Sequence, residues 1–394
     1  MSLSPPPLTT PVDDDSRMHG KKQINVAWQQ WFQNVYTYLG GALSGIFSLN
    51  GGQLAGLRNR IINGDMRVDQ RNNGSAVTPT AATYLVDRWY YYTNIASKLT
   101  FQQVSDAPTG FKYSLKVSVA AQYSPANVDS FVVWQPIEGL NVIDLNLGTA
   151  SAATITCTVW IKGSIAGTYT CYLGNGTGAR SYVGTIAVTT SWAKQTITLI
   201  GDTTGTWPTD NTTGLRLGVD LGSGINQSTT AGVWQAGFFA RTAGSVTFVN
   251  QVNGSTLNIT GVQLELGSTA TTFEQRPYGL EFALCQRYLP ASNGVGVIAN
   301  GHAFSATNAL VTFPFQVPPR VPPTGVSVAN AANFNVWDGG GNLIACTSIG
   351  LYGYAGSYGV ILQPVVAAGL TLGRATSLNA SNANCQILLT GSEL

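Results

Sequence analysis

The stretch GVQLELGSTATTFEQRPYGLEFALCQRYL, residues Gly261–Leu289, contains the change of pattern around which the chain is organised. It opens with apolar and polar residues in alternation, which is typical of a β-strand. It continues with an apolar spacing that fits a short helix with Leu280, Leu284 and Tyr288 on one face. Glu281 would lie off that face. We therefore expect a strand that closes one domain and a helix that leads into the next.

The same stretch holds three of the five glutamates of the chain, Glu265, Glu274 and Glu281. In a protein with 10% charged residues, such a group raises the question of an active site. The three residues, however, fall on a strand, a turn and a helix. Glu265 would point away from its apolar neighbours and clamp the opening strand of the domain. Glu274 would form a local ion pair with Arg276. We interpret the stretch as a junction between two domains.

The composition favours an all-β protein of more than one domain. A chain of 394 residues is long enough for two or three domains. Its low charge, its 45 glycines and its many Thr, Ser, Asn and Val residues are typical of short strands joined by tight turns. A surface with so little charge repels its copies weakly, so solubility would come from burial in an oligomer or a large assembly.

Two β-regions are predicted on either side of the junction. Residues 58–275 contain β-branched segments such as ATITCTVWIKG and GLRLGVDLG, separated by turn residues, and this pattern predicts an antiparallel β-sandwich. Residues 276–394 begin with the short connecting helix and continue as a separate C-terminal β-sandwich domain. The prolines of FPFQVPPRVPP cannot lie in a central strand, so they mark an edge or a crossing between sheets.

Residues 1–57 form a third region, with a proline-rich arm, a helix and a glycine-rich linker. The segment NVAWQQWFQNVYTYLGG predicts a helix that Asn25 caps and Gly40 ends. A helix of about four turns with so apolar a face is not stable alone in water. We expect it to self-associate or to dock on a partner, with packing on the chain's own β-domain as the alternative. The residues of the face are Trp28, Trp31, Phe32, Val35, Tyr38 and Leu39.

Several classes of function are disfavoured by the charge and the motifs. The net charge is +2, and Asp65 and Asp69 interrupt the arginines of RNRIINGDMRVDQR, so we expect no nucleic-acid partner. No apolar run approaches the ~18 residues of a membrane span, and no signal-peptide core is present. The five cysteines include no CxxC pair and predict buried thiols. Cys157 and Cys171 could pair, but their spacing alone does not decide it.

We expect no catalytic residues and no cofactor. The two histidines, His19 and His302, lack metal-ligand spacing, and neither a GxSxG nor a Walker A motif occurs. The segment GNGTGA lies in a β-rich stretch without a following helix, so it reads as a turn. A glycosidase needs two carboxylates at a fixed separation, and the acidic residues here are sparse and mostly in turns. A polysaccharide depolymerase is therefore the least favoured alternative.

Carbohydrate binding fits the composition better than catalysis. Aromatic rings stack on the CH faces of sugars, and amide and hydroxyl groups bind the sugar hydroxyls. The chain has nine Trp and sixteen Tyr residues. For each of them core packing is the alternative, and we expect Trp89 of DRWYYY to be buried at the start of a core strand. The candidate glycan-binding residues are Trp134, Trp207, Trp234, Trp337, Tyr352, Tyr354 and Tyr358.

Two segments carry a resemblance to a known family. RNRIINGDMRVDQRNNG…YLVDRW and ITGVQLELGSTATTFEQRPYGLEFALCQRYL together resemble the tail-fibre and receptor-binding proteins of tailed bacteriophages. In that family an Asn-Gly-Asp opening strand and a Thr-Gly-Val-Gln-Leu-Glu closing strand bracket a jelly-roll sandwich similar to carbohydrate-binding modules. FPFQVPPRVPPTGVSV resembles the strand crossing of the family's C-terminal domain, and the Trp-rich helix is similar to virion-anchoring segments. The resemblance covers most of residues 26–325.

The resemblance implies a homotrimeric fibre or spike protein of a phage virion, made in the cytoplasm of the bacterial host. Its N-terminal arm and helix would attach to other tail, baseplate or head proteins, and its C-terminal domain would form the tip. It would bind a host-surface polysaccharide without cleaving it. The alternative is a collar, baseplate or capsid-decorating protein with protein partners only. In related modules a structural calcium ties the opening strand to the closing strand, and the matching ligands here are Asn63, Asp65 and Glu265.

Overall fold

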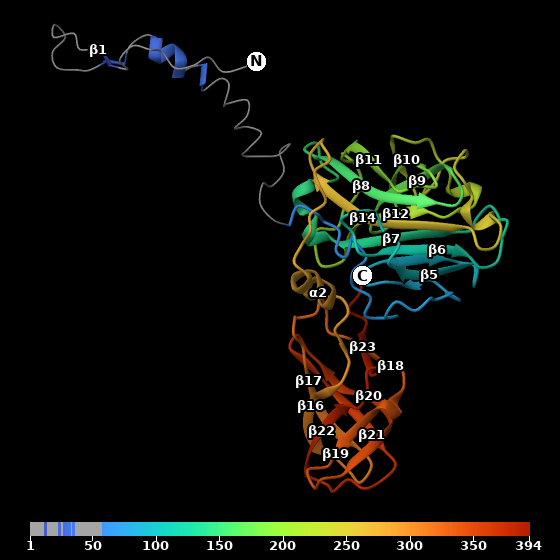
Figure 1. Ribbon diagram of the computed structural model, residues 1–394, viewed down its shortest axis with the longest axis vertical. Helices are drawn as coiled ribbons and strands as arrows, with labels where there is room; N and C mark the ends of the chain where they lie inside the picture. Colours follow the sequence, from blue (N-terminus) through green and yellow to red (C-terminus); the bar gives the residue numbers. More distant parts are fainter. Residues whose placement is uncertain (1–11, 14–22, 25–26, 33, 36–56) are drawn as a thin grey trace.

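The computed structural model describes residues 12–13, 23–24, 27–32, 34–35 and 57–394 (Figure 1). Residues 27–32 and 34–35 are helical, and the rings of Trp28, Trp31 and Phe32 lie 5.3 to 5.7 Å apart. Val35 is helical too, whereas Tyr38 and Leu39 lie outside the described residues. Anchoring and trimer formation by this segment stay predictions. None of the described helices has the length and hydrophobicity needed to cross a bilayer.

Residues 58–275 form two antiparallel sheets packed face to face, so the predicted all-β jelly-roll sandwich is confirmed. The five-stranded sheet has the order β11 (Ala193–Ile200), β8 (Thr154–Gly163), β14 (Thr256–Leu266), β6 (Ser114–Val119) and β5 (Leu99–Val104). The seven-stranded sheet has the order β13 (Trp234–Ala236), β10 (Arg180–Val188), β9 (Gly167–Asn175), β12 (Thr213–Asp220), β7 (Phe131–Glu138), β4 (Tyr90–Thr93) and β3 (Thr83–Tyr84).

The core of the sandwich follows from the alternation along its strands. Residues such as Phe131, Val133 and Leu217 point between the sheets and form one large apolar cluster. Cys157 on β8 and Cys171 on β9 meet across that cluster with their sulfur atoms 4.0 Å apart. All five cysteines are buried free thiols, as the sequence predicted.

Six strands of the C-terminal part close into a barrel, where we had expected a sandwich. Closure depends on β20, a strand of 13 residues whose register with its neighbour shifts twice. Such irregularities bend a strand, and a closed barrel leaves no exposed edge. In barrel order the strands are β16 (Gly296–Ala303), β17 (Ala309–Pro314), β21 (Gly359–Val366), β20 (Leu343–Ala355), β19 (Phe334–Trp337) and β22 (Ala375–Ala380).

A small sheet lies between the barrel and the sandwich (Figure 1). It has the order β15 (Ala291–Asn293), β23 (Gln386–Thr390) and β18 (Gly325–Val328). The proline-rich segment 314–323 connects β17 of the barrel to β18 of this sheet, so the prolines do mark a crossing between sheets. The remaining short elements are β1 (Val12–Asp13), β2 (Gln23–Ile24), η1 (Gly139–Asn141), η2 (Ile143–Leu145), η3 (Ile225–Gln227), η4 (Phe248–Asn250) and η5 (Ala331–Asn333).

The connecting helix α2 (Tyr278–Gln286) lies between the two β-domains, but its buried face differs from the prediction (Figure 1). Leu280 is 42% exposed, whereas Glu281 is buried. The inward face consists of Glu281, Cys285 and the following Tyr288. A glutamate is buried there because donors from the sandwich reach its carboxylate, and the apolar spacing alone gives no sign of them.

Polar contacts hold the connecting segment and the C-terminal end of the chain against the sandwich. Glu138, at the end of β7, accepts hydrogen bonds from the Arg287 guanidinium at 2.7 Å and from the Tyr288 hydroxyl at 2.7 Å. Arg71 pairs with Glu393 at 2.6 Å. Glu138 is almost fully buried, so its two partners are required to offset the cost of burying its charge. The junction is therefore a packed interface.

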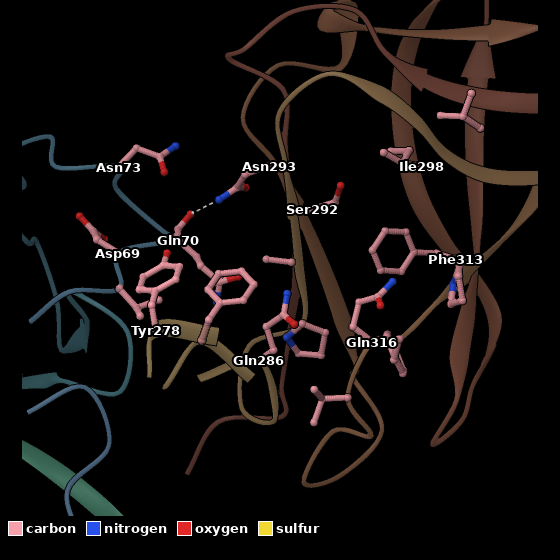
Figure 2. Close-up of a pocket in the computed structure, with 18 residues that line it drawn as sticks. Asp69, Gln70, Asn73, Tyr278, Gln286, Ser292, Asn293, Ile298, Phe313 and Gln316 are labelled. Atoms are coloured by element: carbon pink, nitrogen blue, oxygen red, sulfur yellow. Dashed lines mark hydrogen bonds between the residues drawn. The ribbon is translucent and has the colours of Figure 1, made fainter. Parts of the chain in front are cut away.

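A cleft of about 520 Å³ remains open beside this interface (Figure 2). One wall is the segment 68–73, which leads into the sandwich, and α2 forms the floor between the domains. Residues 290–298 and 313–317 of the C-terminal domain form the opposite wall. Ligand sites of proteins commonly have volumes of ~300 to 1,000 Å³, so the cleft is large enough for a small ligand.

Candidate functional site

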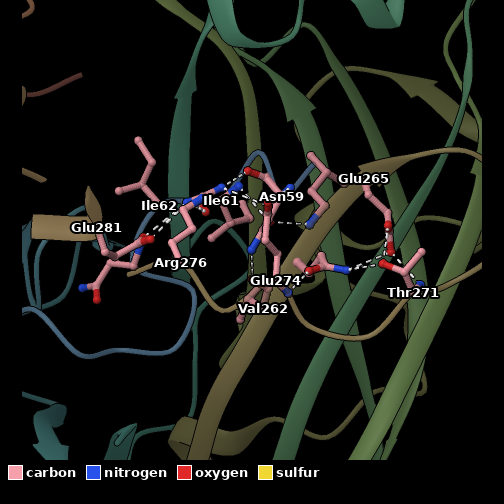
Figure 3. Close-up of polar contacts among 12 residues, drawn as sticks. Asn59, Ile61, Ile62, Val262, Glu265, Thr271, Glu274, Arg276 and Glu281 are labelled. Atoms are coloured by element: carbon pink, nitrogen blue, oxygen red, sulfur yellow. Dashed lines mark hydrogen bonds and ion pairs between the residues drawn. The ribbon is translucent and has the colours of Figure 1, made fainter. Parts of the chain in front are cut away.

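The three glutamates of the junction are each held by donors of the chain itself (Figure 3). Glu265 accepts hydrogen bonds from the Thr271 amide at 2.9 Å and from its hydroxyl at 2.7 Å. Glu274 accepts one from the Asn59 amide at 2.8 Å, and it lies 3.7 Å from Arg276, which confirms the predicted ion pair. Glu281 accepts one from the Asn63 amide and pairs with Arg276 at 3.2 Å. Glu265 thus ties β14 to Thr271 and not to the opening segment, so the predicted clamp by this residue is wrong. Glu274 and Glu281 fasten residues 59–63 to the segment 274–281, which is a structural role.

The three residues predicted from the resemblance to bind calcium have other partners in the structure, and the calcium site stays a prediction. The Asn63 side-chain oxygen accepts a hydrogen bond from the Val68 amide at 2.9 Å, and Asp65 pairs with Arg67. The Glu265 carboxylate is engaged by Thr271. Within the described part of the chain, no three His, Cys, Asp or Glu residues are grouped to hold a metal ion. The three predicted ligands point into separate networks, and a calcium ion needs several oxygens around one point.

Large side chains gather on the outer face of the seven-stranded sheet. Tyr172, Gly218, Trp134 and Tyr90 lie side by side in register across β9, β12, β7 and β4. Alternation along the strands directs them away from the inter-sheet core. A Cβ atom on Gly218 would lie 2.5 Å from the Trp134 Cβ and 2.8 Å from its Cα, so this position needs glycine for β12 to pair closely with β7.

Trp134 is the centre of a stacked aromatic group on this face. The Tyr92 ring lies 4.9 Å from the Trp134 ring at 19°, and the Phe238 ring meets it edge-on at 6.0 Å. The Arg216 guanidinium lies 5.0 Å above the indole, a cation–π contact. Trp134 itself is 5% exposed, whereas Tyr92 is 39% exposed. Tyr92 therefore presents the accessible part of a platform that Trp134 supports.

A hollow of about 430 Å³ opens over this platform. Arg216 donates a hydrogen bond to the Gly176 carbonyl at 2.7 Å, which fixes the guanidinium at the edge of the hollow. Burial raises the pKa of Tyr90, so its hydroxyl stays neutral at physiological pH. The arrangement combines flat apolar rings with fixed hydrogen-bonding groups. The lining residues are Tyr90, Tyr92, Trp134, Pro136, Thr177, Gly178, Thr213, Arg216, Phe238 and Leu394.

The other candidate residues of the sandwich do not reach the hollow. The Trp207 ring meets the Trp234 ring edge-on at 5.4 Å, and both pack against the inter-sheet core. Their indole N–H groups donate to the carbonyls of Thr204 and Ile200 at 3.0 and 2.9 Å. Core packing, the alternative considered for each aromatic residue, is what the structure shows for these two.

The candidates of the C-terminal domain lie apart from one another. Trp337 is partly exposed on β19 beside a shallow hollow of about 590 Å³. Tyr352 packs near Phe304, with ring centres 6.0 Å apart. Tyr358 is exposed in the turn after β20. The Tyr354 side chain lies outside the described residues. Of the six candidates whose side chains the structure describes, only Trp134 therefore belongs to the aromatic platform.

Tyr90, Tyr92 and Arg216 belong to the site, although they were not among the residues predicted from the sequence. A signal for the tyrosines was present in DRWYYY, where every second residue shares a face of a strand. Trp89 is buried as predicted, and Tyr91 is buried with it. Tyr90 and Tyr92, which alternate with them along the strand, must then point outward. Nothing in the local sequence marks Arg216, because its neighbours reach it from other strands.

Comparison with known proteins adds three structures of low similarity. The enzymatically active domain of bacteriophage CBA120 tailspike protein 4 is 13% identical, with a TM-score of 0.29, and the match covers 53% of this chain and 21% of that one. The family 11 carbohydrate-binding module of a Clostridium thermocellum cellulase is 11% identical over 51% of this chain and 99% of that one, with a TM-score of 0.26.

The third structure is that of a protein from Bacteroides thetaiotaomicron that is described as sugar-binding. It is 11% identical over 53% of this chain and 99% of that one, with a TM-score of 0.30. No model of a known protein family matches the chain, and no curated protein matches it. The function is therefore inferred from the geometry of the site.

Proposed function

We propose that the protein binds a glycan through the hollow on the outer face of the seven-stranded sheet. The observation that carries the proposal is the exposed Tyr92 ring, stacked on a buried Trp134 beside Arg216. A sugar ring presents a CH face that packs on an aromatic ring, and its hydroxyls bind directional donors and acceptors. The hollow offers both kinds of contact, and its openness suits a polymer that continues beyond the site.

Replacing Tyr92 with alanine should weaken glycan binding about tenfold, which corresponds to ~1.4 kcal/mol. The variant removes the exposed ring and leaves Trp134 covered by Phe238. Binding would be measured on an array of bacterial surface polysaccharides and then by calorimetry with the best ligand. Leu372→Ala is the control, because that side chain is 73% exposed and lies outside the lining of the hollow. Equal binding by wild type, Tyr92→Ala and Arg216→Ala would refute the proposal.

We further propose that this binding serves host attachment by a phage fibre or spike, with the N-terminal segment joining the chain to the particle. The support is the sequence resemblance of residues 26–325 and the low charge, which suits a protein buried in an assembly. A trimer would carry three hollows, and linked weak sites gain apparent affinity through effective concentration. The rival is a collar, baseplate or capsid-decorating protein that binds other virion proteins.

Removing residues 1–50 should abolish incorporation into particles and leave glycan binding unchanged. The reason is that the aromatic helix lies in this segment, whereas the hollow uses residues 90–238 and Leu394. Purified particles would be probed for the protein by immunoblotting. Incorporation of the shortened chain at the normal level would show that anchoring lies elsewhere. Particles that incorporate the protein normally but adsorb equally well with Tyr92→Ala would favour the decorating role.

A further inference from the structure

The cleft between the sandwich and the barrel is lined by three side chains of α2 at regular spacing (Figure 2). Tyr278, Phe282 and Gln286 are four residues apart, so they follow one face of the helix. The Tyr278 and Phe282 rings are stacked, with centres 5.9 Å apart at 24°. Tyr278 is nevertheless 55% exposed. The helix thus presents an aromatic surface to the cleft, with an amide at its inner end.

Gln286 is 8% exposed, and it lines the cleft at the inner end of the aromatic surface. Its amide offers two donor hydrogens and an acceptor oxygen. A ligand in the cleft would find both a hydrogen-bond donor and an acceptor there.

The walls on either side of α2 add further polar groups. Asp69 is oriented by hydrogen bonds from the Asn72 and Gly74 amides at 3.0 and 2.8 Å. Burial raises the pKa of Asp69 to about 6, so it is an ionised acceptor at neutral pH. Asn293 donates to the Gln70 carbonyl at 3.1 Å, which leaves its side-chain oxygen as an acceptor. Asp69 is the one charged residue that lines the cleft within the described part of the chain.

These features define the chemistry of a ligand. A lone carboxylate disfavours an anion, and the many amide and hydroxyl groups suit a neutral ligand rich in hydroxyls. The exposed ring suits a ligand with an apolar face. We propose that the cleft is a second carbohydrate site, in which a neutral sugar ring stacks on Tyr278 and hydrogen-bonds with Gln286. No residue is shared between the linings of this cleft and of the hollow over Trp134.

The position of the cleft between the domains adds a second measurable effect of binding. Its ligand would contact the sandwich, α2 and the C-terminal domain at once. A ligand that binds only the folded, assembled junction stabilises it by mass action. Binding in the cleft should therefore raise the thermal midpoint, in addition to giving a binding signal.

The test uses saturation-transfer NMR with millimolar methyl glucoside, methyl galactoside, N-acetylglucosamine, maltose and lactose as probes, on full-length protein. At least one probe should still bind Tyr92→Ala and bind Tyr278→Ala about tenfold more weakly. Tyr278→Phe should bind like wild type, because it keeps the ring. Leu280→Ala is the matched control on the same helix, since Leu280 is exposed outside the cleft lining. Circular dichroism confirms that each variant is folded.

Each of the other outcomes decides between the two sites. Loss of all binding in Tyr92→Ala would overturn the cleft site and leave the hollow as the site. Binding lost only in Tyr278→Ala would support the cleft and overturn the hollow. Failure of every probe to bind wild type would overturn the cleft site. A change of oligomeric state in Tyr278→Ala, without any change in probe binding, would also overturn it and would show a subunit interface.

Discussion

Replacing Arg276 with alanine should lower the free energy of unfolding by about 3 to 5 kcal/mol, the range for breaking a buried ion pair. Arg276 pairs with Glu281 at 3.2 Å and donates hydrogen bonds to the carbonyls of Ile61, at 3.1 Å, and of Asn59. Both charged side chains are about 95% buried. The variant would leave the Glu281 carboxylate in the interior without a cation and two carbonyls without a donor. Urea unfolding monitored by tryptophan fluorescence measures the loss.

The controls separate the buried pair from a general loss of charge. Arg374 lies 3.7 Å from Asp338 and its side chain is 45% exposed, so Arg374→Ala should cost less than about 1 kcal/mol. Glu281→Gln keeps an acceptor for the Asn63 amide and removes the charge. The double variant Arg276→Ala with Glu281→Gln should therefore be less destabilised than the sum of the single variants. Equal losses for Arg276→Ala and Arg374→Ala would refute the structural role of the junction.

Replacing Gly64 with alanine should cost about 3 kcal/mol, at the upper end of the range for overpacked sites. A Cβ atom at this position would lie 2.2 Å from the Val262 carbonyl oxygen. The Val262 oxygen is a backbone atom, so it cannot turn away as a side chain could. The Val262 amide also donates a hydrogen bond to the Gly64 carbonyl at 2.9 Å, which holds the two backbones together. The opening and closing segments of the sandwich would have to separate. Thermal unfolding by circular dichroism measures the change.

Gly279→Ala provides the matched control for this substitution. Gly279 lies in α2 with no atom within 4 Å of the added carbon, so the change should stabilise the helix, by up to about 1 kcal/mol. A destabilisation of the same size at both positions would show that the contact between Gly64 and Val262 is not the cause.

The opening and closing segments of the sandwich also show which features the sequence could predict. Asn-Gly-Asp and Thr-Gly-Val-Gln-Leu-Glu were identified as brackets of the sandwich by resemblance, and the structure supplies the physical reason. Gly64 lets the two backbones touch, and Gly261 has a φ of +57°, with Phe111 and Trp160 atoms 2.7 Å from where its Cβ would be. Strands were predictable because alternation is local. Strands such as β5, β6 and β11 carry it within a few residues.

The features that were not predicted correctly depend on residues that are far apart in the sequence. The burial of Glu281 requires a donor from Asn63, which is 218 residues away. The barrel requires irregular pairing between β20 and β21, and residue types do not reveal register shifts. Trp134 was predicted as a binding residue, but its neighbour Arg216 comes from β12 and could not be assigned to it.

The strand that carries Trp134 also contacts the segment that leads from α2 to the C-terminal domain. β7 ends at Glu138, whose carboxylate binds Arg287 and Tyr288 just after α2. β7 is paired along both edges, with β4 on one side and β12 on the other. Part of a pulling force applied to the C-terminal domain would thus reach the sandwich through β7, where the hydrogen bonds on both edges of the strand share the load. Tension at the domain junction and a ligand held at Trp134 act on the same strand.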